Sequence, residues 1–444
     1  MRLTLLQIME VTGGGEVGGT QVGNTYATFH TDSREVVPGG VFFALRGAEM
    51  DGHRFVPDAI ERGAAAVVVD RRMGIAPGIA EVVVPDTWAA LYALAGFVLE
   101  LVKPLVVGIT GSNGKTSTKE MTAAVLAARY DVLRTTGNLN TETGVPLTLL
   151  QLQRDHTALV VEMGLQRAGD IRRLAELAKP SIGVITNIGV VHMEFFESQE
   201  RLARSKGELV AALPPEGHAV LNADDRFFPL LQSLSAAPVT TFGMSAGDYR
   251  VSDYRPLAQG SAFTVRGERI RLAIGGRHQA LNAAAALAAG EAAGVPVADA
   301  AARLAGVSVD HRLEEKPTPE GVIVVDDAYN ASPESMLAAF DAMAERRGGA
   351  RLLAVLGHMG ELGDLAEQSH RRVGERAREV FDAVAVVDSP LGRILAEAAH
   401  AEVVPDNPAA AEWVRRHANR GDRVLVKGSH SRRLEEVVAG LTGR

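Results

Sequence analysis

The stretch that decides the fold reads Leu105-Val-Val-Gly-Ile-Thr-Gly-Ser-Asn-Gly-Lys-Thr-Ser-Thr-Lys-Glu120. Its apolar beginning, Leu105 to Ile109, predicts a buried strand. A glycine-punctuated turn follows and leads through Lys115 and Thr116 into a helix-forming segment, Lys119 to Arg129. A strand, a glycine loop, a Lys-Thr pair and a helix in this order favour a loop that binds phosphate groups.

Each residue of this loop has an expected role. Gly111 and Gly114 can take positive φ angles, so backbone N–H groups can point at phosphate oxygens, and the helix N-terminus adds partial positive charge. Lys115 would reach the β- and γ-phosphates of a nucleotide, and the Thr116 hydroxyl would ligate Mg²⁺. The other loop residues expected to bind the nucleotide are Ser112, Asn113 and Ser117.

The spacing of the loop is shorter than the common phosphate-loop pattern. That pattern needs a glycine at position 109, where this chain has Ile109, and the sequence here is T-G-x-x-G-K-T. The alternative interpretation is a glycine-rich turn that only joins a strand to a helix. The Lys-Thr pair at the predicted start of the helix favours phosphate binding.

Composition limits the class of protein. A length of 444 residues predicts roughly three domains of about 150 residues each. The formal net charge of −8 argues against a general nucleic-acid binder, and the absence of cysteine excludes disulfides, zinc–thiolate sites and cysteine nucleophiles. The beginning of the chain does not read as a signal peptide, and no apolar run reaches the ~18–20 residues of a membrane span. We therefore expect a cytoplasmic protein without membrane insertion.

The order of the predicted elements indicates an α/β fold with three domains. Residues 1–84 form a small mixed domain, with strands expected at 41–45, 65–69 and 81–84 and a helix at 55–62. Residues 85–311 alternate strand and helix, which predicts a parallel sheet covered by helices. Its expected strands are 105–110, 158–163, 182–187 and 218–221, and its expected helices are 117–129, 168–178, 199–212 and 279–293.

Two further segments complete this organisation. Residues 244–274 read as an antiparallel excursion from the central domain. Residues 312–444 alternate again and predict a smaller Rossmann-like domain, with strands at 322–326, 351–356, 383–387 and 423–426. In parallel sheets, ligands collect at the carboxyl ends of the strands. Those ends carry Glu162, Asn187 and the pair Asp224-Asp225.

Motifs along almost the whole chain resemble those of the Mur ligases, the ATP-dependent amide-forming enzymes of peptidoglycan synthesis. Besides the phosphate loop, these motifs are Asp32-Ser-Arg34 with Gly40 to Gly47, Gly137-Asn-Leu-Asn140, Glu162-Met-Gly164, Thr186-Asn-Ile-Gly-Val-Val-His192, Lys206-Gly-Glu208, Gly276-Arg-His-Gln-Ala-Leu-Asn282, Asp326-Asp-Ala-Tyr-Asn330 and Lys427-Gly-Ser429. Several independent motifs in the same order are far more specific than one phosphate loop.

Within the family, the adenosine motif resembles that of the ligase that adds D-alanyl-D-alanine to UDP-N-acetylmuramoyl-tripeptide. That motif is D-D-S-Y-N-A-N-P, and this chain has Asp326-Asp-Ala-Tyr-Asn-Ala-Ser-Pro333. The D-N-P-R motif of the tripeptide-forming ligase is absent, because Ala409 follows Asp406-Asn-Pro408. Two departures stand out: His358 replaces the Asp of L-G-D-M-x-E-L-G, and Gln279 replaces the first Asn of H-N-x-x-N.

The resemblance implies roles for single residues. Thr116, Glu162 and His192 would hold two Mg²⁺ ions together with Lys206, which the family carries as a carbamylated lysine. Asn282 would contact adenine. Arg312 and Asp327 would reach the γ-phosphate and the ribose when the third domain closes, and Asn330 would add a nucleotide contact. The residues expected to bind the UDP-sugar-peptide are Thr31, Ser33, Arg34 and Asn138.

Some of these residues also have a simpler structural interpretation. Glu162 can be a satisfied carboxylate at a strand end, His192 a structural histidine, and Lys206 a cation paired with Glu208 or a phosphate. Two other functions also remain open: a P-loop ATPase switch that joins nothing, and a folylpolyglutamate-type ligase. The block from Asp32 to His53 argues against the second, because it resembles the UDP-substrate domain of the Mur ligases. We expect a monomer, and the sequence predicts neither the third residue of the tripeptide nor the acceptor pocket.

Overall fold

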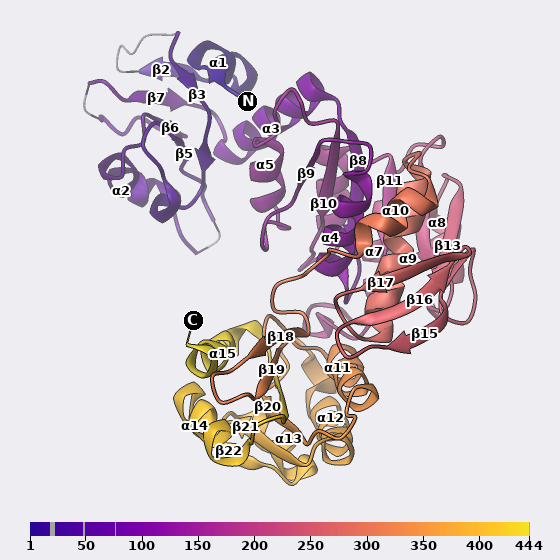
Figure 1. The fold of residues 1–444 in the computed structure, drawn as a ribbon. Helices are drawn as coiled ribbons and strands as arrows, with labels where there is room; N and C mark the ends of the chain where they lie inside the picture. The colour runs from indigo at the N-terminus through magenta and orange to yellow at the C-terminus, as the bar shows by residue number, and fades with distance from the viewer. Residues whose placement is uncertain (18–22, 48, 76, 444) are drawn as a thin grey trace. The chain divides into compact units, whose positions relative to one another are not determined.

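The computed structural model describes residues 1–17, 23–47, 49–75 and 77–443, and has the α/β fold class that the sequence predicts (Figure 1). The chain divides into two compact units. The first consists of Met1–Gly108, Tyr130–Gly164 and Asp170–Ser181, and the second of Ile109–Arg129, Leu165–Gly169 and Ile182–Arg444.

The first unit begins with a five-stranded sheet of order β2-β7-β6-β5-β4. Only β2 runs antiparallel to its neighbour. The strands are β2 (Gly15–Val17), β4 (Phe29–His30), β5 (Val41–Phe43), β6 (Ala66–Val69) and β7 (Ala80–Val83). Phe42, Val67 and Val69 pack against Val56 of helix α2 (Val56–Glu61) and form its core. A short antiparallel pair, β1 (Leu3–Thr4) with β3 (Thr25–Tyr26), flanks helix α1 (Leu5–Thr12).

Helix α3 (Thr87–Val102) is capped at its N-terminus by Asp86. The carboxylate of Asp86 accepts hydrogen bonds from the backbone N–H groups of Trp88 and Ala89, which satisfies two free donors of the first turn. The first unit also contains strands β9 (Val132–Arg134) and β10 (Ala158–Glu162), which run parallel, and helices α5 (Gly144–Leu149) and α6 (Asp170–Ala178).

The predicted central parallel sheet has seven strands in the order β14-β13-β12-β11-β8-β10-β9. Strand β8 (Leu105–Thr110) is the apolar run that precedes the glycine loop. The other strands of this sheet in the second unit are β11 (Ile182–Ile185), β12 (His218–Asn222), β13 (Val239–Gly243) and β14 (Tyr249–Arg250), all in parallel register. Its helices are α4 (Lys115–Leu126), α7 (Gln199–Ala211), α8 (Phe228–Leu234), α9 (Arg277–Ala292) and α10 (Val297–Leu304).

Helix α9 is rich in small buried residues, and this allows a close approach to α4. A Cβ atom on Gly290 would lie 2.3 Å from Val125 Cγ1, which is inside van der Waals contact. The helix carries Gln279 and Asn282 on its buried surface, close to its N-terminus. Tight packing of α9 on α4 therefore brings polar residues of one helix to the N-terminal turn of the other.

The antiparallel excursion that the sequence predicts is a three-stranded sheet of β15 (Ser252–Pro256), β16 (Ser261–Val265) and β17 (Glu268–Leu272). Val265 pairs with Glu268, so Arg266 and Gly267 form a two-residue turn. Both have positive φ angles, 54° and 86°. Such a turn matches the twist of an antiparallel hairpin.

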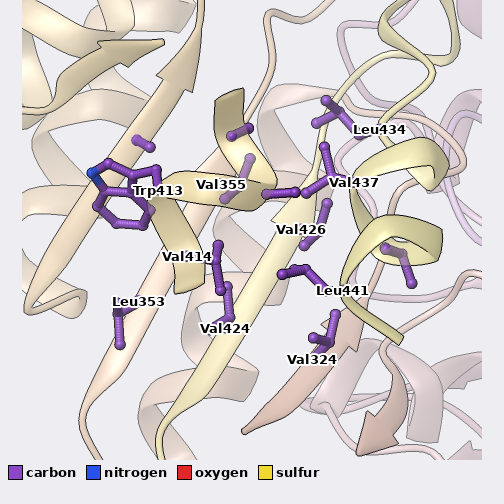
Figure 2. Close-up of a cluster of buried hydrophobic side chains, with 14 of the residues drawn as sticks. Val324, Leu353, Val355, Trp413, Val414, Val424, Val426, Leu434, Val437 and Leu441 are labelled. Carbon is purple, nitrogen blue, oxygen red and sulfur yellow. The ribbon is translucent and has the colours of Figure 1, made fainter. Parts of the chain in front are cut away.

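The C-terminal part is built on a six-stranded sheet of order β18-β19-β23-β20-β21-β22, parallel except for β18. Its strands are β18 (Glu314–Pro317), β19 (Ile323–Asp326), β20 (Leu352–Leu356), β21 (Ala383–Val387), β22 (Glu402–Val404) and β23 (Arg423–Lys427). Its helices are α11 (Pro333–Glu345), α12 (Ala366–Val380), α13 (Pro390–Ala399), α14 (Asn407–His417) and α15 (Glu435–Thr442). Figure 2 shows one face of this sheet, where Leu353, Val355 and Val424 pack with Trp413 and Val437 of helices α14 and α15.

The predicted elements agree with the structure to within a few residues. The largest difference at the site is helix α4, which begins at Lys115 rather than at residue 117, because Gly114 takes a left-handed conformation (φ 83°) and turns the chain directly into the helix. Strand β11 ends at Ile185, so Thr186 and Asn187 lie beyond the strand. Among the described residues, none of the helices combines the length and apolar character that a bilayer crossing requires.

Candidate active site

The glycine loop after β8 is tightly enclosed. Gly111 has φ 146° and Gly114 has φ 83°, angles that L side chains rarely adopt. A Cβ atom on Gly111 would lie 1.9 Å from Thr186 Oγ1, and one on Gly114 would lie 2.4 Å from Asn282 Oδ1. Both positions therefore require glycine for the backbone angle and for space.

Residues from the loop after β11 hold the glycine loop in place. The Asn187 side chain accepts a hydrogen bond from Asn113 N–H (3.0 Å) and donates one to Asn113 O (3.0 Å). The Thr186 hydroxyl donates to the same carbonyl oxygen at 2.6 Å, and Ser112 N–H donates to Asn187 O at 2.8 Å. These contacts, between residues more than 70 positions apart, rigidify the loop before any ligand binds.

Two lysines donate to one carbonyl oxygen of the loop. Lys115 Nζ lies 2.9 Å from Gly111 O, and Lys206 Nζ, which comes from helix α7, lies 3.0 Å from the same oxygen. The Lys206 side chain is 1% exposed. Burial, and then the charge of Lys115, hold the pKa of Lys206 well below its usual value. Two of the predicted catalytic residues are thus brought together.

His192 lies in the same electrostatic environment. It has a left-handed backbone (φ 60°) just before the short helix η3 (Met193–Phe195), and its Nδ1 atom lies 2.5 Å from Glu361 Oε2. Burial lowers the pKa of His192, Glu361 opposes this effect, and the charges of Lys206 and Lys115 lower the pKa further. Imidazole therefore favours its neutral form, the form that can ligate a metal ion.

The loop fits a polyphosphate with its cation. In the part of the chain that the structure describes, Ser112 Oγ and Asn113 Nδ2 are buried without a hydrogen-bond partner, as expected for groups that a ligand satisfies. Thr116 is half-buried in the first turn of α4, and Ser117 behind it is buried. Hydroxyl, amide and ammonium groups converge here, which suits phosphate oxygens and a hard cation.

Asn282, the predicted adenine contact, is on helix α9, and its side chain lies beside Gly114 of the glycine loop. Its amide donates a hydrogen bond to Gln279 Oε1 at 3.1 Å, and both side chains are buried. Gln279 is the residue that departs from the family motif. Its longer side chain supplies an acceptor to Asn282 within the same helical turn.

Glu162 ends strand β10 in the first unit. Its side chain is 2% exposed, and its Oε1 atom accepts a hydrogen bond from Asn140 Nδ2 at 2.8 Å. The Glu162 N–H also donates to Thr135 Oγ1 at 3.0 Å. Glu162 is therefore a buried carboxylate in a fixed orientation.

The predicted C-terminal residues gather around the ends of β19 and β23. Lys427 Nζ lies 2.6 Å from Asp327 Oδ2 and 3.0 Å from Asn330 O. Burial raises the pKa of Asp327 although the charges of Lys427 and Arg312 oppose this. The guanidinium of Arg312 lies 4.6 Å from the centre of the Tyr329 ring. Arg312, Asp327 and Asn330 thus belong to one cluster.

Contacts also join this C-terminal part to the glycine loop within the second unit. Ser332, which caps helix α11, donates a hydrogen bond to Asn113 Oδ1 at 2.8 Å. The Glu334 carboxylate accepts one from Val190 N–H at 3.0 Å. The N-terminus of α11 therefore faces the loops that carry Asn113 and His192.

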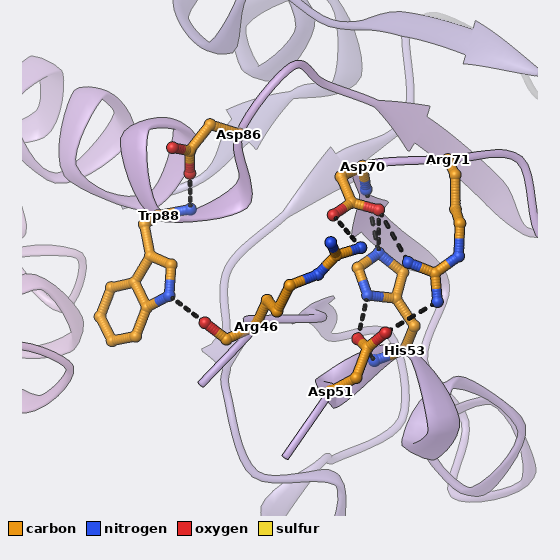
Figure 3. Close-up of polar contacts among 7 residues, drawn as sticks. All are labelled: Arg46, Asp51, His53, Asp70, Arg71, Asp86 and Trp88. Atoms are coloured by element: carbon orange, nitrogen blue, oxygen red, sulfur yellow. Dashed lines mark hydrogen bonds and ion pairs between the residues drawn. The ribbon is translucent and has the colours of Figure 1, made fainter. Parts of the chain in front are cut away.

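The segment from Arg46 to Arg71 in the first unit contains a network of charged side chains, shown in Figure 3. His53 is 1% exposed and lies between Asp51 (Nδ1 to Oδ1, 2.6 Å) and Asp70, whose N–H donates to Nε2 at 3.0 Å. Arg71 bonds both carboxylates, and Arg46 pairs with Asp70 at 2.9 Å. His53 thereby ties the loop after β5 to the end of β6.

A cavity of about 460 Å³ opens beside this network, within the first unit. Trp88 Nε1 donates a hydrogen bond to Arg46 O at 3.0 Å and fixes one wall. The lining combines two arginines, two aromatic residues and one carboxylate: Arg46, Gly47, Trp88, Tyr92, Glu142 and Arg173. Such a lining suits an anionic ligand that has a flat or sugar-like part.

The predicted substrate residues differ in how far they are exposed. Ser33 is buried in the short helix η1 (Ser33–Glu35), whereas Arg34 is 81% exposed and pairs with Asp32. Thr31 is half-buried in the turn before η1, and Asn138 is exposed in the loop after β9. The sequence did not reveal the cavity residues Trp88 and Tyr92 of α3 and Arg173 of α6, because the two helices are far apart in the chain and no local motif joins them.

Comparison with known proteins identifies the family of the chain. Residues 25–97 match the model of the Mur ligase family catalytic domain, residues 109–290 the Mur ligase middle domain, and residues 311–430 the Mur ligase glutamate ligase domain. The chain is 38% identical to the UDP-N-acetylmuramoyl-tripeptide--D-alanyl-D-alanine ligase of Bacillus subtilis, over 93% of this chain and 92% of that protein. It is 35% identical to the Escherichia coli protein of the same name, over 99% and 98%.

Solved structures agree with these sequence matches. MurF from Acinetobacter baumannii superposes with a TM-score of 0.90 and 29% identity, covering 100% of this chain and 99% of that one. MurF ligase from Thermotoga maritima in complex with ADP gives a TM-score of 0.82 and 31% identity, covering 94% and 97%. The three family domains together match most of the sequence, and the chain belongs to the Mur ligase family.

Proposed function

We propose that this chain is an ATP-dependent ligase that adds D-alanyl-D-alanine to UDP-N-acetylmuramoyl-tripeptide in the synthesis of peptidoglycan precursors. The observation that carries the proposal is the glycine loop on which Lys115 and Lys206 converge, in a chain that matches relatives of that name over nearly its full length. The motif Asp326-Asp-Ala-Tyr-Asn330 supports the same member of the family.

The reaction has two covalent steps. A carboxylate oxygen of the tripeptide attacks the γ-phosphorus of ATP and ADP leaves, which gives an acyl phosphate. The amine of D-alanyl-D-alanine then attacks the carbonyl carbon, so that a C–N bond forms and phosphate leaves with the electrons of the broken C–O bond. The protein contributes mainly position and charge, because the transferring phosphoryl group needs little covalent help.

The residues around the glycine loop have separate roles in this reaction. Lys115 exchanges the Gly111 carbonyl for oxygens of the transferring phosphoryl group, and the loop N–H groups hold the neighbouring phosphates. Thr116, Glu162 and His192 are the residues that would hold Mg²⁺, which neutralises phosphate charge when it is bound. Asn282 holds the adenine. Arg312, Asp327 and Asn330 complete the nucleotide site from the C-terminal part. Arg312 reaches the nucleotide after its guanidinium leaves the Tyr329 ring.

Lys206 carries the carbamate in this proposal. Reaction with CO₂ needs a neutral amine, and burial together with Lys115 lowers the pKa of Lys206 in that direction. The carbamate supplies oxygen atoms, which hard cations prefer, and removes a positive charge from beside Lys115. Lys206 would then hold Mg²⁺ together with Thr116, Glu162 and His192.

The UDP-sugar-peptide binds to the first domain in this proposal. Its negatively charged part lies at the cavity lined by Arg46 and Arg173, and Thr31, Ser33, Arg34 and Asn138 provide the remaining contacts. We assign this domain to residues 1–84, the nucleotide domain to 85–311 and the acceptor domain to 312–444. The enzyme works in the cytoplasm as a monomer.

One assay tests the proposal: phosphate release with ATP, Mg²⁺ and UDP-muramoyl-tripeptide, measured with and without D-alanyl-D-alanine. We expect turnover only when both substrates are present. Equal hydrolysis of ATP without them would identify a P-loop ATPase switch. Turnover with a folate substrate and glutamate, and none with the UDP-tripeptide, would identify a folylpolyglutamate-type ligase.

A further inference from the structure

His53 is a buried histidine of the first unit that the proposed chemistry does not use. It lies in the short helix η2 (Gly52–Phe55), and its side chain is 1% exposed. Both ring nitrogens have partners: the Asp70 N–H donates to Nε2 at 3.0 Å, and Nδ1 lies 2.6 Å from Asp51 Oδ1. Because Nε2 accepts a backbone hydrogen, the ring hydrogen lies on Nδ1 and is donated to Asp51. The imidazole thus joins two aspartates in a fixed orientation.

The contact with Asp70 leads from His53 to Arg46. Asp70 follows directly after strand β6, and its carboxylate pairs with Arg46 Nη2 at 2.9 Å (Figure 3). The same residue gives its backbone N–H to His53 Nε2. A polar group that loses its hydrogen-bond partner inside a protein must find another one. Removal of the imidazole would therefore shift Asp70, and the carboxylate that holds Arg46 would move with it.

Arg46 is the side chain on which this network acts at the cavity. Its guanidinium is 57% exposed, and Arg46 lines the cavity of about 460 Å³. Trp88 Nε1 donates to its carbonyl oxygen at 3.0 Å, so the backbone is held separately from the guanidinium. The pair with Asp70 uses one nitrogen of a group that has five N–H donors, and the other donors remain available to an anion. Asp70 thus selects one direction of a long, flexible side chain before a ligand binds.

Resting on the function proposed above, we infer that His53 is a positioning residue for the UDP-sugar-peptide. Through Asp70, it fixes the direction in which Arg46 presents its guanidinium to the anionic part of this substrate. His53 is not one of the residues that line the cavity, so it acts on the substrate only through other side chains. Its loss therefore weakens substrate binding and leaves the phosphoryl transfer unchanged.

A competing role for His53 is to stabilise the fold alone. The Asp51 carboxylate accepts the His53 N–H at 3.0 Å at the start of η2 and pairs with Arg71 at 2.9 Å. That role predicts a loss of stability whose effect on substrate affinity does not depend on Arg46. The two roles therefore differ in whether the effects of His53 and Arg46 on affinity are coupled.

The test measures the calorimetric affinity of the full-length protein for UDP-N-acetylmuramoyl-tripeptide, with an ATP analogue and Mg²⁺ present, and the steady-state KM and kcat. His53→Asn is too short to accept the Asp70 N–H, and should raise the Kd and KM for the UDP-tripeptide about 3- to 10-fold. The kcat and the KM for ATP should stay within about twofold of wild type. His53→Gln can accept that N–H and should lie closer to wild type. His156→Asn is the matched control, because His156 also accepts a backbone N–H in the first unit, from Gln153 at 2.9 Å, but lies outside the cavity lining.

A double-mutant cycle with Arg46→Ala decides between the two roles. Arg46→Ala should raise the Kd about 10-fold or more, and addition of His53→Asn should then change the Kd by no more than about twofold. If urea unfolding shows that His53→Asn is not folded at the assay temperature, Asp70→Asn takes its place, because it breaks the same path at the next residue. Additive effects in the cycle, or an unchanged Kd in the single variants, overturn the inference. A wild type that neither binds the UDP-tripeptide nor turns it over overturns the proposed function instead.

Discussion

Substitution of Gly111 by alanine tests the enclosed geometry of the phosphate loop. The new Cβ atom would lie 1.9 Å from Thr186 Oγ1, so one of the two must move by at least about 1 Å. Thr186 cannot turn away freely, because its hydroxyl donates to Asn113 O at 2.6 Å. Giving up that buried hydrogen bond costs about 1–3 kcal/mol, and the backbone angle of 146° adds about 1–2 kcal/mol for a residue with a side chain.

We therefore expect Gly111→Ala to lower the free energy of unfolding of this region by about 2–5 kcal/mol. Gly267→Ala is the matched control: its φ angle is also positive, 86°, but no atom lies within 4 Å of the new Cβ. That variant should show only the backbone cost of about 1–2 kcal/mol. Urea unfolding followed by fluorescence, and calorimetric affinity for an ATP analogue, measure the two effects.

A double-mutant cycle with Thr186→Ala isolates the clash. Removing Oγ1 removes the atom that Gly111→Ala would strike, so the double variant should be more stable than the sum of the single changes by about 1–3 kcal/mol. The affinity for the ATP analogue should recover in parallel. Strictly additive effects would show that the hydroxyl is not the obstacle, and would refute the reasoning from this geometry.

Three further predictions follow from the same site. Lys115→Ala should lose on the order of 10² or more in turnover, since it removes a charge from the transferring phosphoryl group, whereas the exposed Lys179→Ala should not; equal losses would contradict the role of Lys115. Burial lowers the pKa of His278 to about 4 from 6.5. Stability that is present above pH 6.5 should therefore fall by at most about 3 kcal/mol as the pH drops toward 4, and His278→Asn should flatten this part of the pH–stability curve. Acetate or propionate should restore part of the activity of Lys206→Ala if the lysine carries a carbamate; rescue by short alkylamines alone would leave Lys206 a cation.

The sequence predicted the parts of the fold that depend on local patterns. Strand β8, the glycine loop and helix α4 are adjacent in the chain, so spacing and residue type were enough to order them. The antiparallel sheet from β15 to β17 was also expected, because its turn residues lie next to its strands. The short edge strands β18 and β22 were missed, since β18 has three charged residues among its four and β22 is only three residues long, so neither carries a periodic signal.

The residues of the site were predictable only where they belong to one local sequence motif. Lys115, Thr116 and Lys206 each stood in a recognisable motif, and their roles stay predictions until they are measured. The bonds that hold the loop, from Thr186 and Asn187 to Asn113, join distant positions and could not be read from either segment alone. Glu361 was part of a noted motif, but its meaning depends on His192, which lies in a different domain of the sequence.

The two lysines on the Gly111 carbonyl connect the fold to the chemistry. Burial lowers the pKa of Lys206, and the positive charge of Lys115, which donates to the same carbonyl oxygen, lowers it further. If Lys206 is an unmodified amine with a lowered pKa, a bound polyphosphate raises that pKa, so binding should take up protons. If binding of the nucleotide with Mg²⁺ instead favours the carbamate, the affinity should rise with dissolved CO₂ and protons should be released, because the reaction of an amine with CO₂ gives a carbamate and a proton. The amine and the carbamate therefore predict opposite proton changes on nucleotide binding. The sign of that proton change distinguishes the two states of Lys206.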